Sequence, residues 1–310
     1  MTAPPTGRQY ELVHGAQRAV VVELGAGLRE YGSDERALLD GYALDEHPDG
    51  GRGQLLLPWP NRIADARYPF AGQELRLPVN EPRTGSAIHG LVRDRPWRHI
   101  DSSTTAVTLA LDLPPQQGYP FTLGLTVTYS LSDIGLTVEV VALNAGERPC
   151  PYGAGAHPYV RLAAGGRIDD ALLRIPAGAI LEADDRGIPT GVELPVEGTS
   201  FDFRNARPVG PLQLDTAFAR LEPDDDGFTR IALTAPDGPE GAVVWMDPSH
   251  GYVMVYSGDT LPDVERRRHG VAIEPMTCAP DAFNSGAGLL VLHPGEQHRS
   301  TWGISPLSPH

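Results

Sequence analysis

The feature that most constrains the fold is a two-residue alternation in "FTLGLTVTYSLSDIGLTVEVVAL", residues 121–143. Apolar side chains alternate with polar or small ones from Leu123 to Leu131, and again from Leu136 to Val140. Successive side chains of a strand point to opposite faces, so this pattern predicts two strands that each have one buried face. The residues between them, 132–135, predict a short turn that closes a β-hairpin.

Shorter apolar segments bounded by Gly, Pro or Asp recur along the chain. "RAVVVELGAGLREY" predicts a strand, a glycine turn and a second strand. Further strands are predicted in "DALLRIPAG", "TRIALTAP", "GAVVWMD", "GYVMVYSG" and "GLLVLHPGEQHRSTWGI". The 35 glycines and 30 prolines are spread without a period, which favours many short strands and turns over disorder. We therefore expect an all-β protein built as a large antiparallel β-sandwich.

Neither an internal repeat nor a break in composition divides the 310 residues. We expect a flexible N-terminus over residues 1–9 and a single domain over residues 10–310. The formal net charge is −15, and such a field repels phosphate backbones and anionic lipid, so neither nucleic acid nor membrane is expected as a partner. The two cysteines and the polar N-terminal segment "MTAPPTGRQYELVHG" lead us to expect free thiols in a cytoplasmic protein, either a monomer or a homodimer.

Motifs for common cofactors and metals are incomplete. The third glycine of the G-x-G-x-x-G pattern begun in "GAGLREYG" is replaced by Glu30, which argues against a dinucleotide site. "EPDDDG" begins with Glu222 and has Leu233 at the twelfth position, so a solvated turn is a better interpretation than a calcium loop. The sequence contains no H-E-x-x-H, no zinc-spaced cysteine pair and no G-x-S-x-G. We expect no cofactor and no metal, and Cys278 is interpreted as a small buried hydrophobic residue.

Polar residues at the ends of predicted strands form the candidate site. In "HGVAIEPMTCAPDAFNSG" an apolar strand ends at Glu274, and a carboxylate there is paired, exposed to solvent, or placed in a pocket to transfer a proton. Spacing alone leaves its possible partners open between structural and functional roles. These partners are Asn61 and Arg62 in "PWPNRIADARYPFAG", His89 in "GSAIHGLVRDRPW", His157 in "PYGAGAHPYVRL" and Asp215 in "FDFRNARPVGPLQLDTAF".

These stretches resemble motifs of the aldose 1-epimerase (galactose mutarotase) family, from about residue 10 to residue 304. The matching pieces, in order, are "NRI", "HG", "AHPYVRL", "GIPTG" with "SFDFRNARPVG" and "LDTAF", "IEPMTCAPDAFN" and a closing "LHPGE". The resemblance implies a galactose mutarotase-like supersandwich of antiparallel strands, with a sugar cleft on one face. That fold agrees with the all-β prediction made from periodicity.

The resemblance also implies an activity and roles for the candidate residues. The activity is that of an isomerase, which interconverts the α and β anomers of a free hexose by opening and reclosing the hemiacetal ring without a cofactor. Glu274 matches the general base that takes the proton of the anomeric hydroxyl, and His157 matches the general acid that protonates the ring oxygen. Arg62, His89 and Asp215 match sugar-binding residues, with Asn61 as their neighbour in the cleft.

The residue types suit this chemistry on physical grounds as well. A free glutamate is ionised at neutral pH, and we expect adjacent carboxylates to push His157 toward its protonated form, which gives one base and one acid. General acid–base assistance typically contributes about 10²–10⁴ in rate per group. A non-catalytic carbohydrate-binding β-sandwich is the alternative from another class of protein.

The chain departs from the galactose-type pattern in two places. Those members carry "TnHsYFNL" around the acid and a glutamine two residues after the base, whereas here "GAHPYVRL" and Met276 occupy these positions. We expect a neutral hexose such as glucose or galactose, with a sulfonated or phosphorylated hexose as the alternative. Arg266, Arg267 and Arg268 form either a solvated basic edge or an anion contact. Trp59 either stacks on the pyranose ring or belongs to the core.

Overall fold

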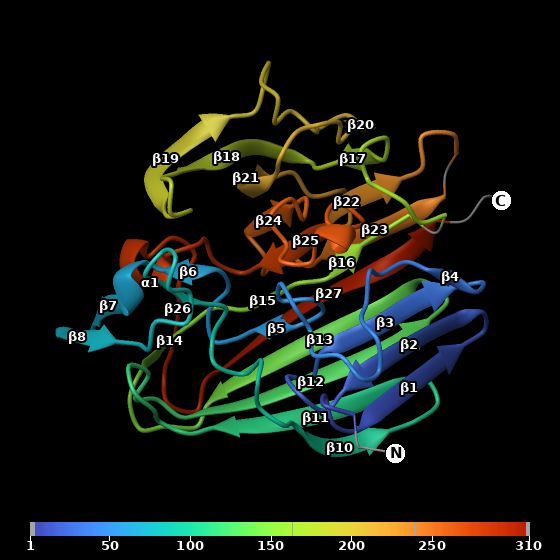
Figure 1. The fold of residues 1–310 in the computed structure, drawn as a ribbon. Coiled ribbons are helices and arrows are strands. Elements are labelled where there is room, and N and C mark those ends of the chain that lie inside the picture. The colour runs from blue at the N-terminus through green and yellow to red at the C-terminus, as the bar shows by residue number, and fades with distance from the viewer. Residues whose placement is uncertain (1–3, 163, 239, 308–310) are drawn as a thin grey trace.

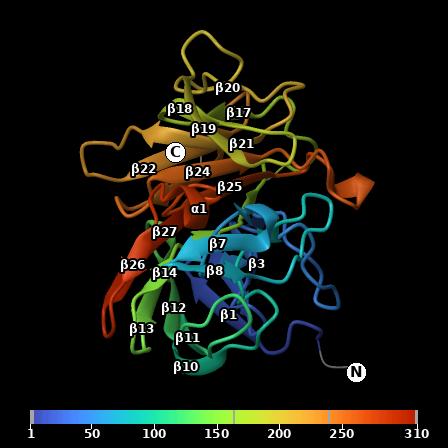
Figure 2. The same ribbon diagram turned by 90° about the vertical axis from the view of Figure 1, so that its left-hand side faces the viewer.

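Two large antiparallel sheets lie one over the other in the computed structural model, which describes residues 4–162, 164–238 and 240–307 (Figure 1). Side chains from both sheets, such as Val127 of one and Val255 of the other, belong to the same hydrophobic cluster. Figure 2 shows the same layering from the side. The predicted all-β antiparallel sandwich is therefore confirmed.

One of the two layers is a sheet of nine strands within the described residues. Its middle strand is β27, the last strand in the sequence, which pairs with β13 on one side and β23 on the other. In spatial order the strands are β10 (Arg98–Ser102), β11 (Ala106–Leu113), β12 (Leu123–Ser132), β13 (Gly135–Asn144), β27 (Gln297–Leu307), β23 (Gly241–Met246), β22 (Thr229–Thr234), β17 (Leu172–Arg174) and β20 (Arg207–Pro208).

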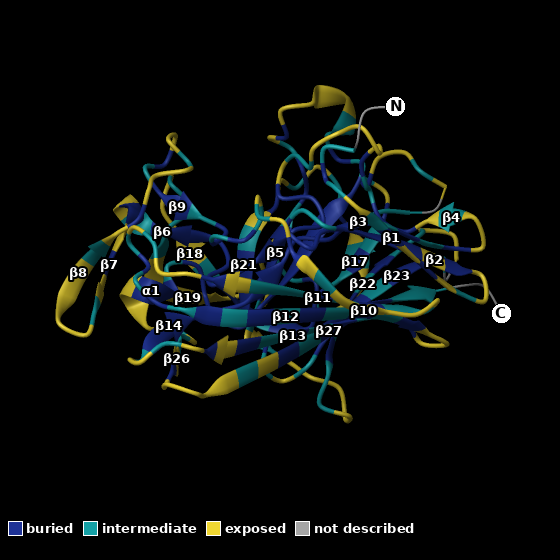
Figure 3. Cartoon of the chain, turned by 90° about the horizontal axis from the view of Figure 1, so that it is seen from below, coloured by how far each residue is buried: buried dark blue, intermediate teal, exposed yellow. Residues whose placement is uncertain are grey.

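The hairpin predicted from alternation is formed by β12 and β13. Their register pairs Ser132 with Gly135 across the turn, as the sequence indicated. Buried and partly exposed residues alternate along β12, so one face of the hairpin lies in the core. Figure 3 shows this alternation of burial along the long strands.

The other layer is a sheet of eight strands among the described residues, and it carries most of the candidate site. Both β15 and β16 pair with β25 on the same side. The strands are β19 (Pro189–Pro195), β18 (Ala177–Ala183), β21 (Asp215–Leu221), β24 (Tyr252–Tyr256), β25 (Val271–Met276), β15 (Gly155–Ala156), β5 (Leu55–Leu56) and β16 (Tyr159–Val160).

Smaller sheets extend the two layers. One is a four-stranded sheet of β1 (Gln9–His14), β2 (Gln17–Val22), β3 (Leu28–Ser33) and β4 (Arg36–Ala37). It contains the strand, turn and strand predicted near the N-terminus, and its strand β1 contacts β11 and β12. Two-stranded pairs join β6 (Arg62–Ile63) to β9 (Ala87–Ile88), β7 (Arg67–Phe70) to β8 (Gln73–Arg76), and β14 (Cys150–Tyr152) to β26 (Leu290–Leu292). The short helices are η1 (Ala64–Ala66), η2 (Val264–Arg266) and α1 (Ala282–Ser285).

The N-terminal segment predicted to be flexible contacts the rest of the protein over its described part, residues 4–9. Thr6 is fully buried and its carbonyl accepts a hydrogen bond from the backbone of Leu24. Residues 1–3 of that prediction lie outside the described residues. No helix in the described part of the chain is long and apolar enough to cross a membrane.

Candidate active site

The candidate acid and base are opposite one another on adjacent segments of the eight-stranded sheet. Glu274 is the fourth residue of β25, a strand in which every residue is buried. Because β15 and β16 pair with β25 in one continuous register, His157, which lies between them, is placed opposite Glu274. The backbone of His157 is held from its other side, since its N–H donates to the carbonyl of Gln54 and its carbonyl accepts from Gly53.

The two side chains are in direct contact. The Nε2 of His157 lies 3.2 Å from Oε1 of Glu274, and both side chains are almost fully buried. The second carboxylate oxygen, Oε2, and the second ring nitrogen, Nδ1, have no hydrogen-bond partner among the described residues. Buried polar atoms normally have a partner, so these two are available to a ligand or to water.

Burial shifts the proton affinities of this pair in opposite directions. Burial first, and then the charge of Asp215, raises the pKa of Glu274 well above its ordinary value. Burial and then the charge of Arg93 lower the pKa of His157 to about 3. The expectation that carboxylates push His157 toward protonation is therefore not met, because desolvation and a nearby arginine oppose the charged imidazole.

The pair nevertheless holds one transferable proton over a wide pH range. A protonated Glu274 beside a neutral His157 has the same proton count as a carboxylate beside an imidazolium, and the two forms differ only in where the proton lies along the 3.2 Å contact. The two groups therefore titrate as a unit. The charged form supplies one base and one acid.

A second pair of segments holds three more candidate residues: Arg62 begins β6, Asn61 directly precedes β6, and His89 directly follows β9. The backbone N–H of Asn61 donates to Nδ1 of His89 at 3.2 Å, and its carbonyl accepts from the backbone of His89 at 2.9 Å. This bond assigns the proton of the neutral imidazole to Nε2, which makes Nε2–H a donor. Burial lowers the pKa of His89 well below its ordinary value, so the ring is neutral at physiological pH.

Arg62 is oriented by a carboxylate that the sequence analysis did not single out. Its Nε and Nη2 donate to the two oxygens of Glu81 at 2.7 and 2.9 Å, a bidentate arrangement that fixes the plane of the guanidinium. A Cβ on Gly187 would lie 2.6 Å from Nη1 of Arg62, so this glycine lets the backbone lie against the guanidinium. Of the two terminal nitrogens, Nη1 is the one not bonded to Glu81.

All six predicted site residues line one cavity of about 380 Å³, which also has Arg83, Arg93, Tyr159, Tyr256 and Thr260 in its lining. Asp215, the first residue of β21, is the most exposed of the six. A neighbouring cavity of about 670 Å³ shares Arg62, Arg83, Asp215 and Thr260 with the first. The structure thus brings the predicted residues together, and their roles in a reaction stay predictions.

Trp59 belongs to the core and not to the cavity. Its side chain is buried and lies against Tyr119 and Phe283, with ring centroids 6.4 and 5.6 Å away. The interpretation of Trp59 as a stacking surface for the sugar is therefore wrong. The aromatic rings in the cavity lining are Tyr159 and Tyr256, together with the two histidines.

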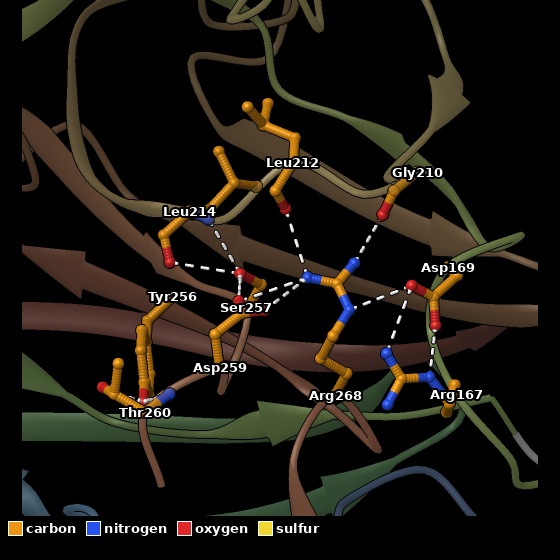
Figure 4. Close-up of polar contacts among 10 residues, drawn as sticks. All are labelled: Arg167, Asp169, Gly210, Leu212, Leu214, Tyr256, Ser257, Asp259, Thr260 and Arg268. Atoms are coloured by element: carbon orange, nitrogen blue, oxygen red, sulfur yellow. Dashed lines mark hydrogen bonds and ion pairs between the residues drawn. The ribbon is translucent and has the colours of Figure 1, made fainter.

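The arginine triplet does not line the cavity either. Arg268 is buried and donates to the carboxylates of Asp169 and Asp259 and to the carbonyls of Gly210 and Leu212 (Figure 4). It thus joins the segment before β21 to the loop after β24. Arg268 is neither a solvated basic residue nor an anion contact.

The other two arginines of the triplet also have partners within the protein. Arg266 donates to the carbonyl of Gly41 and to Glu46, and Arg267 donates to the carbonyl of Leu261. The anion contact considered for the triplet thus has no support in the structure.

Besides Arg62, two cationic residues that the sequence did not indicate line the cavity, Arg83 and Arg93. Arg83 is exposed and makes no side-chain hydrogen bond or ion pair within the described residues, and Arg93 donates to Gln54 at 3.2 Å. Neither stands out from the sequence, because both lie in loops without a strand pattern around them. The described residues contain no cluster of three or more His, Cys, Asp or Glu side chains that could hold a metal ion.

Fold and site together define a large antiparallel β-sandwich protein with a polar cleft that contains a buried Glu–His pair. The chain belongs to the aldose 1-epimerase family, whose profile matches residues 8–305. The family-level activity is that of an epimerase, a kind of isomerase.

Relatives with similar sequences include proteins with and without a stated activity. The chain is 36% identical over 300 residues to the uncharacterized protein YihR of Escherichia coli, covering 96% of this chain and 93% of that protein. It is 31% identical over 264 residues to the galactose mutarotase of Rattus norvegicus, covering 78% of this chain and 75% of the relative.

Solved structures support the fold. A GalM/aldose epimerase homologue from C. elegans superposes with a TM-score of 0.85 at 20% identity, covering 97% of this chain and 99% of the other. A galactose 1-epimerase from Lactobacillus acidophilus superposes with a TM-score of 0.81 at 19% identity, covering 97% and 95%.

Proposed function

We propose that this protein is an aldose 1-epimerase that interconverts the α and β anomers of a free neutral hexose. The observation that carries the proposal is the buried contact between His157 and Glu274 at a cavity of about 380 Å³, a volume within the usual range for small-molecule sites. A protein that only binds sugar needs neither an acid nor a base. Family membership supports the same activity.

The proposed reaction needs two proton transfers. The Glu274 carboxylate accepts the proton of the anomeric hydroxyl, and the electron pair of that O–H bond forms the carbonyl of the open-chain aldehyde. The bond between the anomeric carbon and the ring oxygen breaks, and the ring oxygen takes a proton from His157. Rotation about the adjacent carbon–carbon bond and reversal of the transfers give the other anomer.

The remaining cavity residues would orient the ring. Arg62 offers Nη1, and His89 offers Nε2–H as a donor to a sugar oxygen, because its Nδ1 is occupied by the backbone of Asn61. Asp215 offers a carboxylate as acceptor for sugar hydroxyls at the more exposed part of the lining. Tyr256, which is only partly buried, supplies a ring face for the apolar side of a pyranose.

Anomer exchange of freshly dissolved sugars tests the proposal. Polarimetry or NMR saturation exchange with α-D-glucose and α-D-galactose is expected to show equilibration far faster than the buffer rate, with Glu274→Gln as the matched inactive control. Sugar binding without accelerated exchange would instead support the carbohydrate-binding alternative.

An anionic hexose is a second candidate substrate, supported by Arg83 and Arg93. Both line the cavity, and neither has a carboxylate hydrogen-bond partner among the described residues. A sulfonate or phosphate could be bound by such side chains, although the net charge of −15 repels anions at long range.

Comparing kcat/KM for a neutral hexose and its 6-sulfonate or 6-phosphate separates the two substrate classes. The anionic substrate is favoured if kcat/KM is tenfold or more higher for the charged sugar, which corresponds to about 1.4 kcal/mol. This advantage should shrink as salt is added. For a neutral substrate, Arg83→Gln is expected to leave kcat unchanged.

A further inference from the structure

A short glycine-rich loop, residues 49–53 with the sequence "DGGRG", lies directly against the candidate acid. Gly51 has a φ of +78°, and a Cβ at this position would lie 2.6 Å from Cδ2 of His157. Any other residue would therefore displace the imidazole or the loop. The loop thus approaches His157 as closely as a backbone can.

This loop turns the side chain of Arg52 into the protein interior. The guanidinium is 1% exposed, its Nε donates to Asp49 at 3.0 Å, and its Nη1 pairs with the carboxylate of Asp40. The remaining nitrogen, Nη2, is buried without a hydrogen-bond partner in the described part of the chain. A buried guanidinium with an unsatisfied N–H costs folding free energy. The two ion pairs alone therefore do not explain why Arg52 is buried.

The face of the guanidinium provides that explanation. Its central carbon lies 4.5 Å from the centroid of the Tyr159 ring, in a cation–π contact. The Tyr159 ring in turn stacks on the imidazole of His157, with centroids 4.9 Å apart and planes 17° apart. The hydroxyl of Tyr159 donates to the carbonyl of Gly50 at 2.9 Å, so the same loop contacts both the hydroxyl and a face of the tyrosine ring. A continuous series of contacts thus leads from Arg52 through Tyr159 and His157 to Glu274.

The charged and titratable groups around His157 come from several segments. Glu274 of β25 contacts Nε2, and the ring of His89 packs edge-on with centroids 5.4 Å apart. Arg93 and Arg52 supply positive charge without a hydrogen bond to the ring. The one carboxylate in contact with the ring favours protonation of His157, whereas the two guanidinium charges disfavour it.

We propose that Arg52 is a positioning residue for the general acid: it holds Tyr159 flat against His157 and fixes the plane in which Nε2 faces Glu274 and the sugar. The inference rests on the proposed function for its catalytic meaning. Arg52 itself touches neither the sugar nor the transferred proton. A misplacement of a catalytic group by about 1 Å can cost about 100-fold in rate, so a residue of this kind acts on kcat.

The test compares Arg52→Met, which keeps an apolar stem but removes the charge and the planar face, with Arg52→Lys, which keeps the charge. Arg266→Met is the matched control, since Arg266 also lies near Asp49, at 3.9 Å, but does not contact Tyr159. Steady-state anomerisation and an NMR titration of the His157 imidazole, assigned by its loss in His157→Asn, are measured for each variant. Circular dichroism establishes that each is folded.

The expected result is a fall in kcat of about 10- to 100-fold in Arg52→Met, with KM changed less than about threefold. The His157 titration is expected to move to higher pH, and Arg52→Lys is expected to lose activity while its titration moves less. Arg266→Met is expected to stay within about twofold of wild type in both measurements.

The NMR titration keeps this inference separate from the proposed function. If the wild type equilibrates no sugar, the proposed function fails, whereas a changed NMR shift of the His157 ring in a folded Arg52→Lys, which keeps the positive charge, still supports the positioning role. A folded Arg52→Lys or Arg52→Met with wild-type kcat overturns the inference, whatever its His157 titration, because the loss of charge alone moves that titration. If Arg52→Met does not fold, Arg52→Lys decides by the same two measurements.

Discussion

His157 and Glu274 are cross-strand neighbours, and their 3.2 Å contact is set by the register in which β15 and β16 pair with β25. The spacing of an acid–base pair built in this way is fixed by backbone hydrogen bonds and not by mobile loops. Catalytic substitutions at either position are therefore expected to leave the fold intact.

Replacing Glu274 with glutamine is expected to lower kcat at least about 100-fold, because the amide cannot accept the anomeric proton. The melting temperature is expected to change little, since the two side chains have nearly the same shape and Gln can still hydrogen-bond to His157. Polarimetry and a thermal melt check both statements. Wild-type exchange in this variant would remove Glu274 from the role of base.

His157→Asn and Asp215→Asn are expected to differ in which kinetic constant changes. Loss of the proton donor lowers kcat, whereas loss of a sugar contact that is present in both ground and transition state raises KM. Steady-state kinetics over a range of sugar concentrations separate the two effects. If His157→Asn changed KM alone, His89 would become the first candidate for the acid.

The pH dependence of kcat/KM is expected to follow the coupled pair and not a free histidine. The pair gains a second proton only near the lowered pKa of His157, about 3. It loses its shared proton only above the raised pKa of Glu274, which burial sets. Activity is therefore expected to persist below the ordinary histidine value of about 6.5 and to fall on the alkaline side. A fall of kcat/KM on the acid side centred near pH 6.5 would contradict the coupled pair.

Glu81→Gln is expected to raise KM and to lower the free energy of unfolding by about 1–3 kcal/mol, because Arg62 loses a charged, bidentate partner in a mostly buried site. Glu74→Gln is the matched control, since Glu74 pairs with Arg76 and both side chains are largely exposed. That control is expected to cost about 0–1 kcal/mol. Urea titrations and steady-state kinetics measure the two effects, and equal costs for both variants would argue against a positioning role for Glu81.

Arg268→Met is expected to destabilise the fold by about 3–5 kcal/mol, because it leaves the mostly buried Asp259 without its cationic partner. Arg230→Met removes a guanidinium from the more exposed ion pair with Asp226 and is expected to cost about 0–1 kcal/mol. Chemical denaturation of the two variants provides the comparison. A small effect at Arg268 would mean that the segment before β21 is held by other contacts.

Much of the architecture could be predicted because the strands show as a two-residue periodicity or an apolar run in the local sequence. The β12–β13 hairpin follows from alternation, and β25 follows from its apolar run. The predicted end of that strand at Glu274 is wrong, because β25 continues to Met276 by pairing with β24. The partnership of Arg62 with Glu81 and the cation–π contact of Arg52 could not be predicted, because both depend on how distant loops meet. Burial of Trp59 and the lowered pKa of His157 are likewise properties of the assembled interior.

The place of β27 in the middle of the nine-stranded sheet has a consequence for synthesis on the ribosome. β10–β13 and β22–β23 are separate groups of strands until β27 joins them, and β27 follows every other described strand in the sequence. A nascent chain halted before residue 297 therefore exposes two open strand edges, on β13 and β23, that the finished sheet covers. Closure of this sheet therefore waits for the synthesis of residues 297–307 and depends on pairing between segments far apart in the sequence.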